Sequence, residues 1–159
     1  MSKSQLLENY LNGVKTVRDA VEGLSPEQLK ARPVAGKWSA LEVVCHLADF
    51  EPIYADRMKR ILSHDRPALA SVDEQKLAKL AYQERDVREE LNVIEATRKA
   101  FARLLGALPD SALQRTGIYQ HEGKDEERTV EKFLTLITGH IPHHVKFIHE
   151  KRKALGLPG

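Results

Sequence analysis

Apolar residues recur at helical spacing in four long stretches of the chain. The first runs from about Ser4 to Gly23 and the second from Ser39 to about Ser63. The third runs from about Glu84 to Leu108 and the fourth from Val130 to about Leu155. Within each stretch the apolar positions lie three or four residues apart, which is the period of one face of an amphipathic helix. Four such segments predict an all-α protein.

Local signals support these boundaries. Ser39 followed by Glu42 forms a capping box, and Thr129 is placed to cap the fourth helix. Another capping box, at Ser25–Gln28, has proline in the first helical position and predicts a short additional helix. Pro52 lies inside the second helix and is expected to kink it, because proline removes a backbone hydrogen bond.

One connection between the predicted helices is long. Asp65 to Gln83 is polar, with room for a crossover and a short helix around Glu74 to Leu80. Thr116 to Arg128 is the least helical stretch, with a short extended piece expected at Ile118 to His121. Short loops favour antiparallel neighbours, whereas a long link lets the second and third helices run parallel. We predict one domain over residues 1–159, a four-helix bundle with a long crossover connection between helices two and three.

Composition narrows the class of protein. The chain has 159 residues, 42% of them hydrophobic, which is enough to bury one core. Its 25 basic and 23 acidic residues give a net charge of +2, which argues against a nucleic-acid partner. No apolar run approaches the ~20 residues that span a bilayer, and no secretory signal is visible. The only cysteine, Cys45, cannot form an intrachain disulfide. We expect a cytoplasmic protein without a nucleic-acid or membrane partner.

Histidine placement supplies the candidate chemistry. His140 and His144 lie four residues apart in the fourth predicted helix, so they share a face, and that face carries apolar residues. In the second helix, His46 also falls on the inward face, four residues before Phe50. Three inward imidazoles would each need a buried partner, and one divalent metal ion would satisfy all of them. The alternative is that they are ordinary core histidines.

Two neighbouring residues qualify this prediction. If the fourth helix began at Pro142, His140 would lie outside it and the pair would be lost. The periodic run before Pro142 indicates instead a helix that continues through the proline. His143 is interpreted as a substitute ligand or a proton carrier at the rim of a pocket, or else as a surface or interface histidine.

Several motifs together resemble the DinB-like superfamily of metal-binding four-helix bundles. They are Leu24-Ser25-Pro26-Glu27-Gln28-Leu29, Gly36-Lys37-Trp38-Ser39 with Glu42, His46-Leu47-Ala48-Asp49, and His140-Ile141-Pro142-His143-His144, in the same order over nearly the whole chain. The resemblance implies an up-down-down-up bundle that can form a homodimer. It also implies a divalent ion, nickel or zinc, held by His46, His140 and His144.

The resemblance further implies thiol chemistry. Characterised branches of the superfamily transfer a low-molecular-weight thiol or use it as a cofactor. The leading hypothesis is therefore a metal-dependent thiol S-transferase that attacks a small electrophilic substrate through a metal-activated thiolate. One alternative is a metal-dependent hydrolase that uses a metal-bound water. Another is a non-catalytic metal-binding protein with a role in stress or interaction.

Other residues near these motifs are assigned smaller roles. Asp49, three residues after His46, is placed to steady a ligand ring or the helix junction, or is an ordinary surface carboxylate. Arg57 returns to the same helix face; we interpret it as part of a partly exposed salt bridge, or else as a contact for an anionic substrate. Trp38 and Tyr54 are expected in the core or the pocket wall, and Cys45 is not expected to be a functional thiol.

Overall fold

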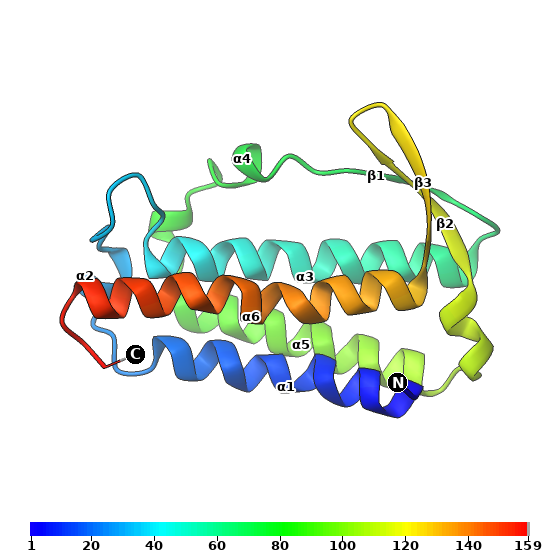
Figure 1. The fold of residues 1–159 in the computed structure, drawn as a ribbon, viewed down its shortest axis with the longest axis horizontal. Helices are drawn as coiled ribbons and strands as arrows, with labels where there is room; N and C mark the ends of the chain where they lie inside the picture. Colours follow the sequence, from blue (N-terminus) through cyan, green and yellow to red (C-terminus); the bar gives the residue numbers. More distant parts are fainter. Residues whose placement is uncertain (159) are drawn as a thin grey trace.

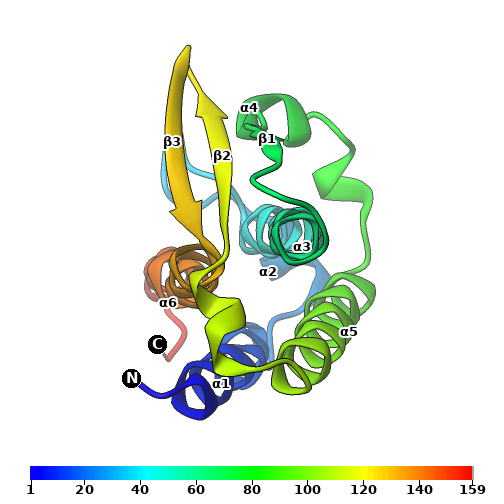
Figure 2. The ribbon, with the colours of Figure 1, turned by 90° about the vertical axis from the view of Figure 1, so that its right-hand side faces the viewer.

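The computed structural model describes residues 1–158, in which four long helices pack side by side (Figure 1). They are α1 (Lys3–Val21), α3 (Ala40–Ser63), α5 (Val87–Gly106) and α6 (Val130–Ala154). α1 and α3 each pack against α5 and α6, so α1 and α3 occupy opposite corners of the bundle (Figure 2). α3 and α5 run parallel, and α1 and α6 run in the opposite direction. The predicted four-helix bundle with up-down-down-up topology is confirmed.

Side-chain caps fix where the helices begin. Capping boxes at Ser2 and Ser39 open α1 and α3, and Ser25 opens the short α2 (Pro26–Lys30) in the same way. The Asp86 carboxylate accepts from two backbone N–H groups at the start of α5, and the Thr129 hydroxyl accepts one at the start of α6. These bonds satisfy N–H groups that have no partner inside their own helix.

The crossover between α3 and α5 contains β1 (Ala68–Ala70), α4 (Glu74–Leu77) and a 3-10 helix, η1 (Tyr82–Glu84). After α5 come a second 3-10 helix, η2 (Asp110–Gln114), and the strands β2 (Thr116–His121) and β3 (Lys124–Thr129). β2 lies between the other two strands, parallel to β1 and antiparallel to β3. The small sheet stands over one end of α3 and α6 (Figure 2).

The sheet was predicted only as a short extended piece. β3 reads Lys-Asp-Glu-Glu-Arg-Thr and is largely exposed, so it has no apolar alternation to reveal it. Its hairpin turn, Glu122-Gly123, has positive φ angles of 48° and 73°, as a two-residue turn of this kind requires. β1 is only three residues long and depends on β2 for its hydrogen bonds.

A buried ion pair separates two apolar clusters inside the bundle. Phe101, Phe133 and Ile137 belong to the cluster nearer the sheet, and Leu47 and Ile141 belong to the other. Between them the guanidinium of Arg98 on α5 meets the carboxylate of Glu51 on α3, and both side chains are fully buried. Among the described residues, no helix is long and apolar enough to cross a membrane.

Candidate metal centre

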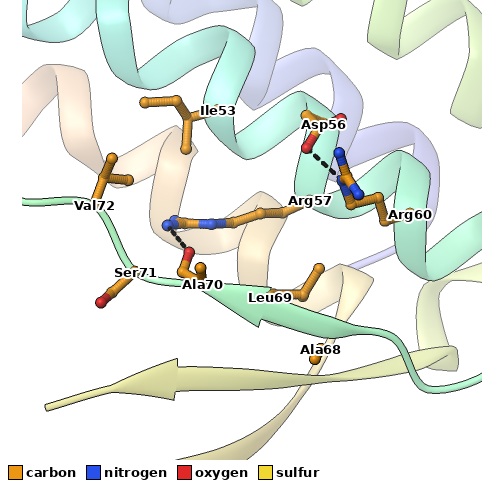
Figure 3. Close-up of a pocket in the computed structure, with 9 residues that line it drawn as sticks. All are labelled: Ile53, Asp56, Arg57, Arg60, Ala68, Leu69, Ala70, Ser71 and Val72. Carbon is orange, nitrogen blue, oxygen red and sulfur yellow. Dashed lines mark hydrogen bonds and ion pairs between the residues drawn. The ribbon is translucent and has the colours of Figure 1, made fainter.

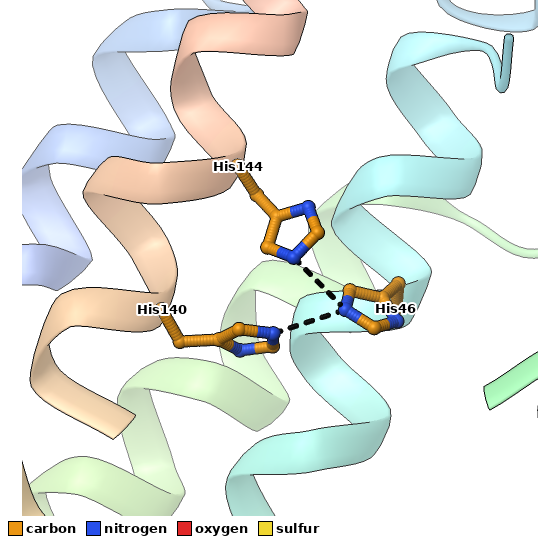
Figure 4. A group of neighbouring side chains, drawn as sticks. All are labelled: His46, His140 and His144. Carbon is orange, nitrogen blue, oxygen red and sulfur yellow. Dashed lines mark hydrogen bonds between the residues drawn. The ribbon is translucent and has the colours of Figure 1, made fainter. Parts of the chain in front are cut away.

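The histidines predicted to act together meet where α3 packs against α6. His46 lies in the first half of α3, and His140 and His144 lie one turn apart in α6. Their rings converge from the two helices (Figure 4). The Nε2 atom of His46 lies 3.0 Å from Nε2 of His140 and 3.2 Å from Nε2 of His144. One ring nitrogen from each histidine lies within 4.8 Å of the ring nitrogens of the other two.

Pro142 does not break this arrangement. α6 runs without interruption from Val130 to Ala154, so His140 and His144 remain on one face of one helix. Pro142 is exposed and has no N–H to offer the carbonyl of Thr138. The alternative in which the fourth helix begins at Pro142 is wrong. α3 likewise continues through Pro52.

The three imidazoles are neutral at pH 7. Burial, with His144 nearby, lowers the pKa of His46 to about 4. Burial and the neighbouring histidines lower the pKa of His140 to about 2, and burial with His143 lowers that of His144 to about 4. The Nδ1 atoms of His46 and His140 are buried and have no hydrogen-bond partner among the described residues. The protein alone therefore leaves this cluster of polar atoms poorly satisfied.

The donor set fits a divalent cation. Nitrogen ligands about 2.0–2.1 Å from a tetrahedral zinc ion lie about 3.3 Å apart. The two short Nε2 separations, 3.0 and 3.2 Å, are close to that value. Three protein ligands are typical of catalytic zinc sites, which keep a further position open, whereas structural sites have four.

Aromatic rings hold the histidines in place. The ring of Trp38 lies 5.3 Å from the ring of His46, and the ring of Phe50 lies 4.7 Å from it, measured between centroids. Phe50 also contacts His140, at 5.5 Å. Since such packing restricts side-chain rotation, the Nε2 atoms are oriented toward one another in advance. Trp38 thus lies in the wall of the site, as expected.

A pocket of about 210 Å³ lies beside His144. Its lining residues come from the loop before α3 and from the faces of α3 and α6: Gly36, Lys37, Trp38, Val43, His144, Phe147 and Lys151. Lys151 is 3% exposed, and its ammonium group donates to the carbonyl of Phe147 at 3.1 Å. The ammonium of Lys37 lies 5.8 Å from the centroid of the Phe147 ring. The pocket therefore combines aromatic walls with two cationic groups.

Asp49 lies at a junction between α3 and the crossover, which is one of the roles predicted for it. Its carboxylate accepts a hydrogen bond from the Tyr82 hydroxyl at 2.9 Å and one from Arg85 at 2.7 Å. Because Nδ1 of His46 has no partner among the residues that the structure describes, Asp49 does not form a hydrogen bond with that ring. Asp49 therefore joins α3 to the end of the crossover, and a role in steadying a ligand ring stays a prediction. Tyr82 and Arg85 were not recognised from the sequence.

His143 and Cys45 lie near the site and differ in their exposure to solvent. His143 is exposed, and its ring lies 5.0 Å from that of His144, so it stands at the rim of the site. Its role as a proton carrier stays a prediction. Cys45 is fully buried, its thiol contacts the Tyr82 carbonyl at 3.5 Å, and burial raises its pKa to about 12. A thiol in that state is a poor nucleophile, in line with the expectation.

Arg57 does not form the salt bridge predicted for it, and the alternative of a contact for an anionic substrate stays a prediction. It is 4% exposed, and it has no carboxylate partner among the described residues. Its Nη2 atom donates to the Ala70 carbonyl at 2.8 Å. The expected partly exposed salt bridge is therefore wrong, because β1 covers this part of α3.

Comparison with known proteins gives the class to which this fold and site belong. The family model of the DinB superfamily matches residues 13–148, and the chain belongs to that superfamily. Among individual proteins, it is similar to YfiT of Bacillus subtilis, with 30% identity over 141 residues, or 88% of this chain and 78% of YfiT. A protein of Bacillus licheniformis is 29% identical over 155 residues, which covers 94% of this chain and 87% of the relative.

The solved structure of YfiT extends this similarity to three dimensions. It superposes with a TM-score of 0.88 and 26% identity, and the match covers 98% of this chain and 89% of YfiT. That structure is described as a probable metal-dependent hydrolase with an unusual four-helix bundle topology. The Bacillus licheniformis relative is likewise assigned provisionally as a metal-dependent hydrolase.

Proposed function

We propose that this protein is a metal-dependent hydrolase in which His46, His140 and His144 hold one divalent ion. The observation that carries the proposal is the convergence of three neutral imidazoles beside an open pocket. When bound by three neutral ligands, such an ion keeps its charge and an open position, and it lowers the pKa of a water bound there. The names given to the bacterial relatives support hydrolysis as the reaction.

The protein's own groups have separate tasks in this proposal. Trp38 and Phe50 fix the ligand rings, so the three nitrogens need little rearrangement. Lys37 and Lys151 line the pocket and would bind an anionic group of a small substrate. His143, at the rim, would move a proton between the site and solvent.

A thiol S-transferase is the second candidate. The cationic pocket beside His144 would suit an anionic thiol as well as an anionic hydrolase substrate. Cys45 cannot supply that thiol, because it is buried and its pKa is raised to about 12. A transferase reaction would therefore need a free low-molecular-weight thiol. Three imidazoles suit either nickel or zinc. The homodimer and the cytoplasmic location stay predictions.

An assay with and without thiol separates the two reactions. The full chain, loaded with zinc or nickel, would be tested on p-nitrophenyl esters and phosphates, and on 1-chloro-2,4-dinitrobenzene with glutathione or cysteine. We expect ester or phosphate hydrolysis that needs metal and no thiol. His140→Ala should lower the rate about 100-fold or more, since removal of a catalytic metal removes its activation of water. His149→Ala, an exposed histidine on the same helix, is the matched control.

The other outcomes are equally informative. Thiol-dependent consumption of the chlorodinitrobenzene, faster with the metal-loaded chain than without protein or with His140→Ala, would establish the transferase in place of the hydrolase. If the protein binds metal through the three histidines but turns over neither class of substrate, the enzyme proposal fails and a metal-binding role without catalysis follows.

A further inference from the structure

A second cavity, of about 390 Å³, lies between α3 and the β1 segment (Figure 3). α3 contributes Ile53, Asp56, Arg57 and Arg60, and the crossover contributes residues 68–72. Arg57 is eleven residues beyond His46, which is about 16 Å along a helix. This cavity is therefore separate from the candidate metal centre, and its size is within the range of small-molecule sites.

Arg57 forms no ion pair with a carboxylate among the described residues. Arg57 is 4% exposed, yet only Nη2 has a hydrogen-bond partner among the described residues, the Ala70 carbonyl. The other buried arginine, Arg98, has Glu51 as its counter-charge, and all three of its guanidinium nitrogens donate hydrogen bonds. Because an unpaired buried charge is costly, the free edge of Arg57 indicates a group that accepts from it.

Aromatic contacts hold the Arg57 guanidinium in one place. Its central carbon lies 5.3 Å from the ring centroid of Tyr54 and 5.1 Å from that of Tyr119. A second guanidinium, that of Arg128, lies 4.2 Å from the same Tyr119 ring, but its charge is paired with the carboxylate of Glu126. Cation–π contacts orient a guanidinium but do not neutralise its charge.

The carboxylate of Asp56, which lines the cavity, already has an ion-pair partner. Asp56 accepts a hydrogen bond from Nε of Arg60 at 2.7 Å, and both side chains are largely exposed (Figure 3). Asp56 and Arg60 therefore balance each other at the rim. The charge that remains inside the cavity is the positive charge of Arg57.

We propose that this cavity binds a small oxyanion, the phosphate or carboxylate group of a metabolite, on the guanidinium of Arg57. The planar fork of arginine presents paired N–H donors that match the two oxygens of such a group. The cavity is larger than a phosphate ion, so it has room for the rest of a small ligand. The site does not depend on the metal or on the proposed hydrolysis.

Titration calorimetry on the metal-free full chain tests this site. Sodium phosphate and sodium acetate would be titrated separately, at an ionic strength matched with sodium chloride. We expect saturable binding of at least one of them, and the one that binds identifies the chemical group. Arg57→Lys keeps the charge but loses the fork, so its affinity should fall at least tenfold, and Arg57→Met should not bind.

Arg103→Met is the matched control, because it removes the same charge from an exposed position on α5, outside the cavity. Its affinity should stay within about threefold of the original. The proposal is overturned if the original chain shows no saturable binding of either ion, or if Arg57→Lys binds as tightly as the original. Circular dichroism of each variant shows that it is folded, and Arg57→Lys decides the question if Arg57→Met does not fold.

Discussion

Two polar clusters lie close together inside the same bundle, and they differ in how many of their polar atoms have hydrogen-bond partners within the protein. In the first, Arg98 donates to Glu51 from Nε at 2.9 Å and from Nη2 at 2.6 Å. Its other bonds go to backbone carbonyls of Tyr10 and Ile137. Each of the four long helices contributes to this cluster. On α1, Gly13 leaves room for Arg98, because a side chain at that position would collide with the guanidinium.

The second cluster is that of His46, His140 and His144. Here three neutral rings direct their Nε2 atoms at one another, and two Nδ1 atoms have no partner among the described residues. Hydrogen bonds between the rings can satisfy only part of this set. A cluster whose polar atoms are all hydrogen-bonded stabilises the fold. A cluster whose polar atoms lack partners is suited to binding a ligand, in this case a divalent ion.

The largest effect is expected where the complete cluster is broken. Glu51→Ala leaves the Arg98 charge buried without a partner, which should lower the free energy of unfolding by about 3–5 kcal/mol. Urea denaturation measures this loss. The metal content of the folded variant should not change. A loss below about 1 kcal/mol would contradict the assignment of this pair as structural.

The same pair permits a sharper test. Replacing both partners, with Glu51→Leu and Arg98→Met, removes the charges together and should cost less than Glu51→Ala alone. Equal or greater destabilisation of the double variant would show that the hydrogen bonds to the backbone matter more than the balance of charge.

The histidine cluster should respond to metal instead. Zinc at about 100 times its dissociation constant should raise the free energy of unfolding by about 2.7 kcal/mol, because the ion binds only the folded chain. His140→Ala should fold without metal and show little of this gain. Urea denaturation with zinc, and with EDTA as the reference, measures the difference. The same zinc-dependent gain in His140→Ala would contradict the assignment.

Acid should destabilise the metal-free chain through the histidine cluster. The folded-state pKa values of His46 and His144 are about 4, below the ordinary value of 6.5, so the unfolded chain takes up protons first. Stability of the metal-free chain should therefore be highest above pH 6.5 and fall as the pH is lowered toward 4. His140→Ala should show a shallower fall, because one depressed group is gone and burial around the others is relieved. Urea denaturation between pH 6.5 and pH 4 measures both proteins. If the free energy of unfolding falls as steeply in His140→Ala as in the original chain, the assignment of these pKa values to the cluster is contradicted.

The smallest effect is expected at Asp49. Asp49→Asn weakens the bonds from Tyr82 and Arg85, which should cost about 1 kcal/mol in a partly exposed setting. Its metal content should equal that of the original chain. If metal is lost instead, Asp49 does support a ligand ring, and the contacts seen at the crossover are secondary.

The main features of the fold and site were accessible from the sequence because they depend on local pattern. Helical period and caps predicted the four helices to within a few residues. His46 and His140 are 94 residues apart, but both could be assigned to inward faces, and the spacing of His140 and His144 is itself local. That is enough to place all three in one core.

Features that depend on distant contacts were not accessible in this way. Asp49 meets Tyr82 and Arg85, which lie 33 and 36 residues away on a connection without regular pattern. The burial of Arg57 results from β1, a strand of three residues that forms by pairing with β2. No period in the sequence marks either contact.

Metal content per chain tests the central claim most directly. Plasma mass spectrometry would be applied to protein without a histidine tag, dialysed against zinc or nickel and then against buffer. We predict about one equivalent in the original chain and in His149→Ala, and less than about a tenth in His46→Ala and His144→Ala, because these ligands bind one ion together. An original chain that stays folded yet holds no metal, or full metal content in both ligand variants, would contradict the account.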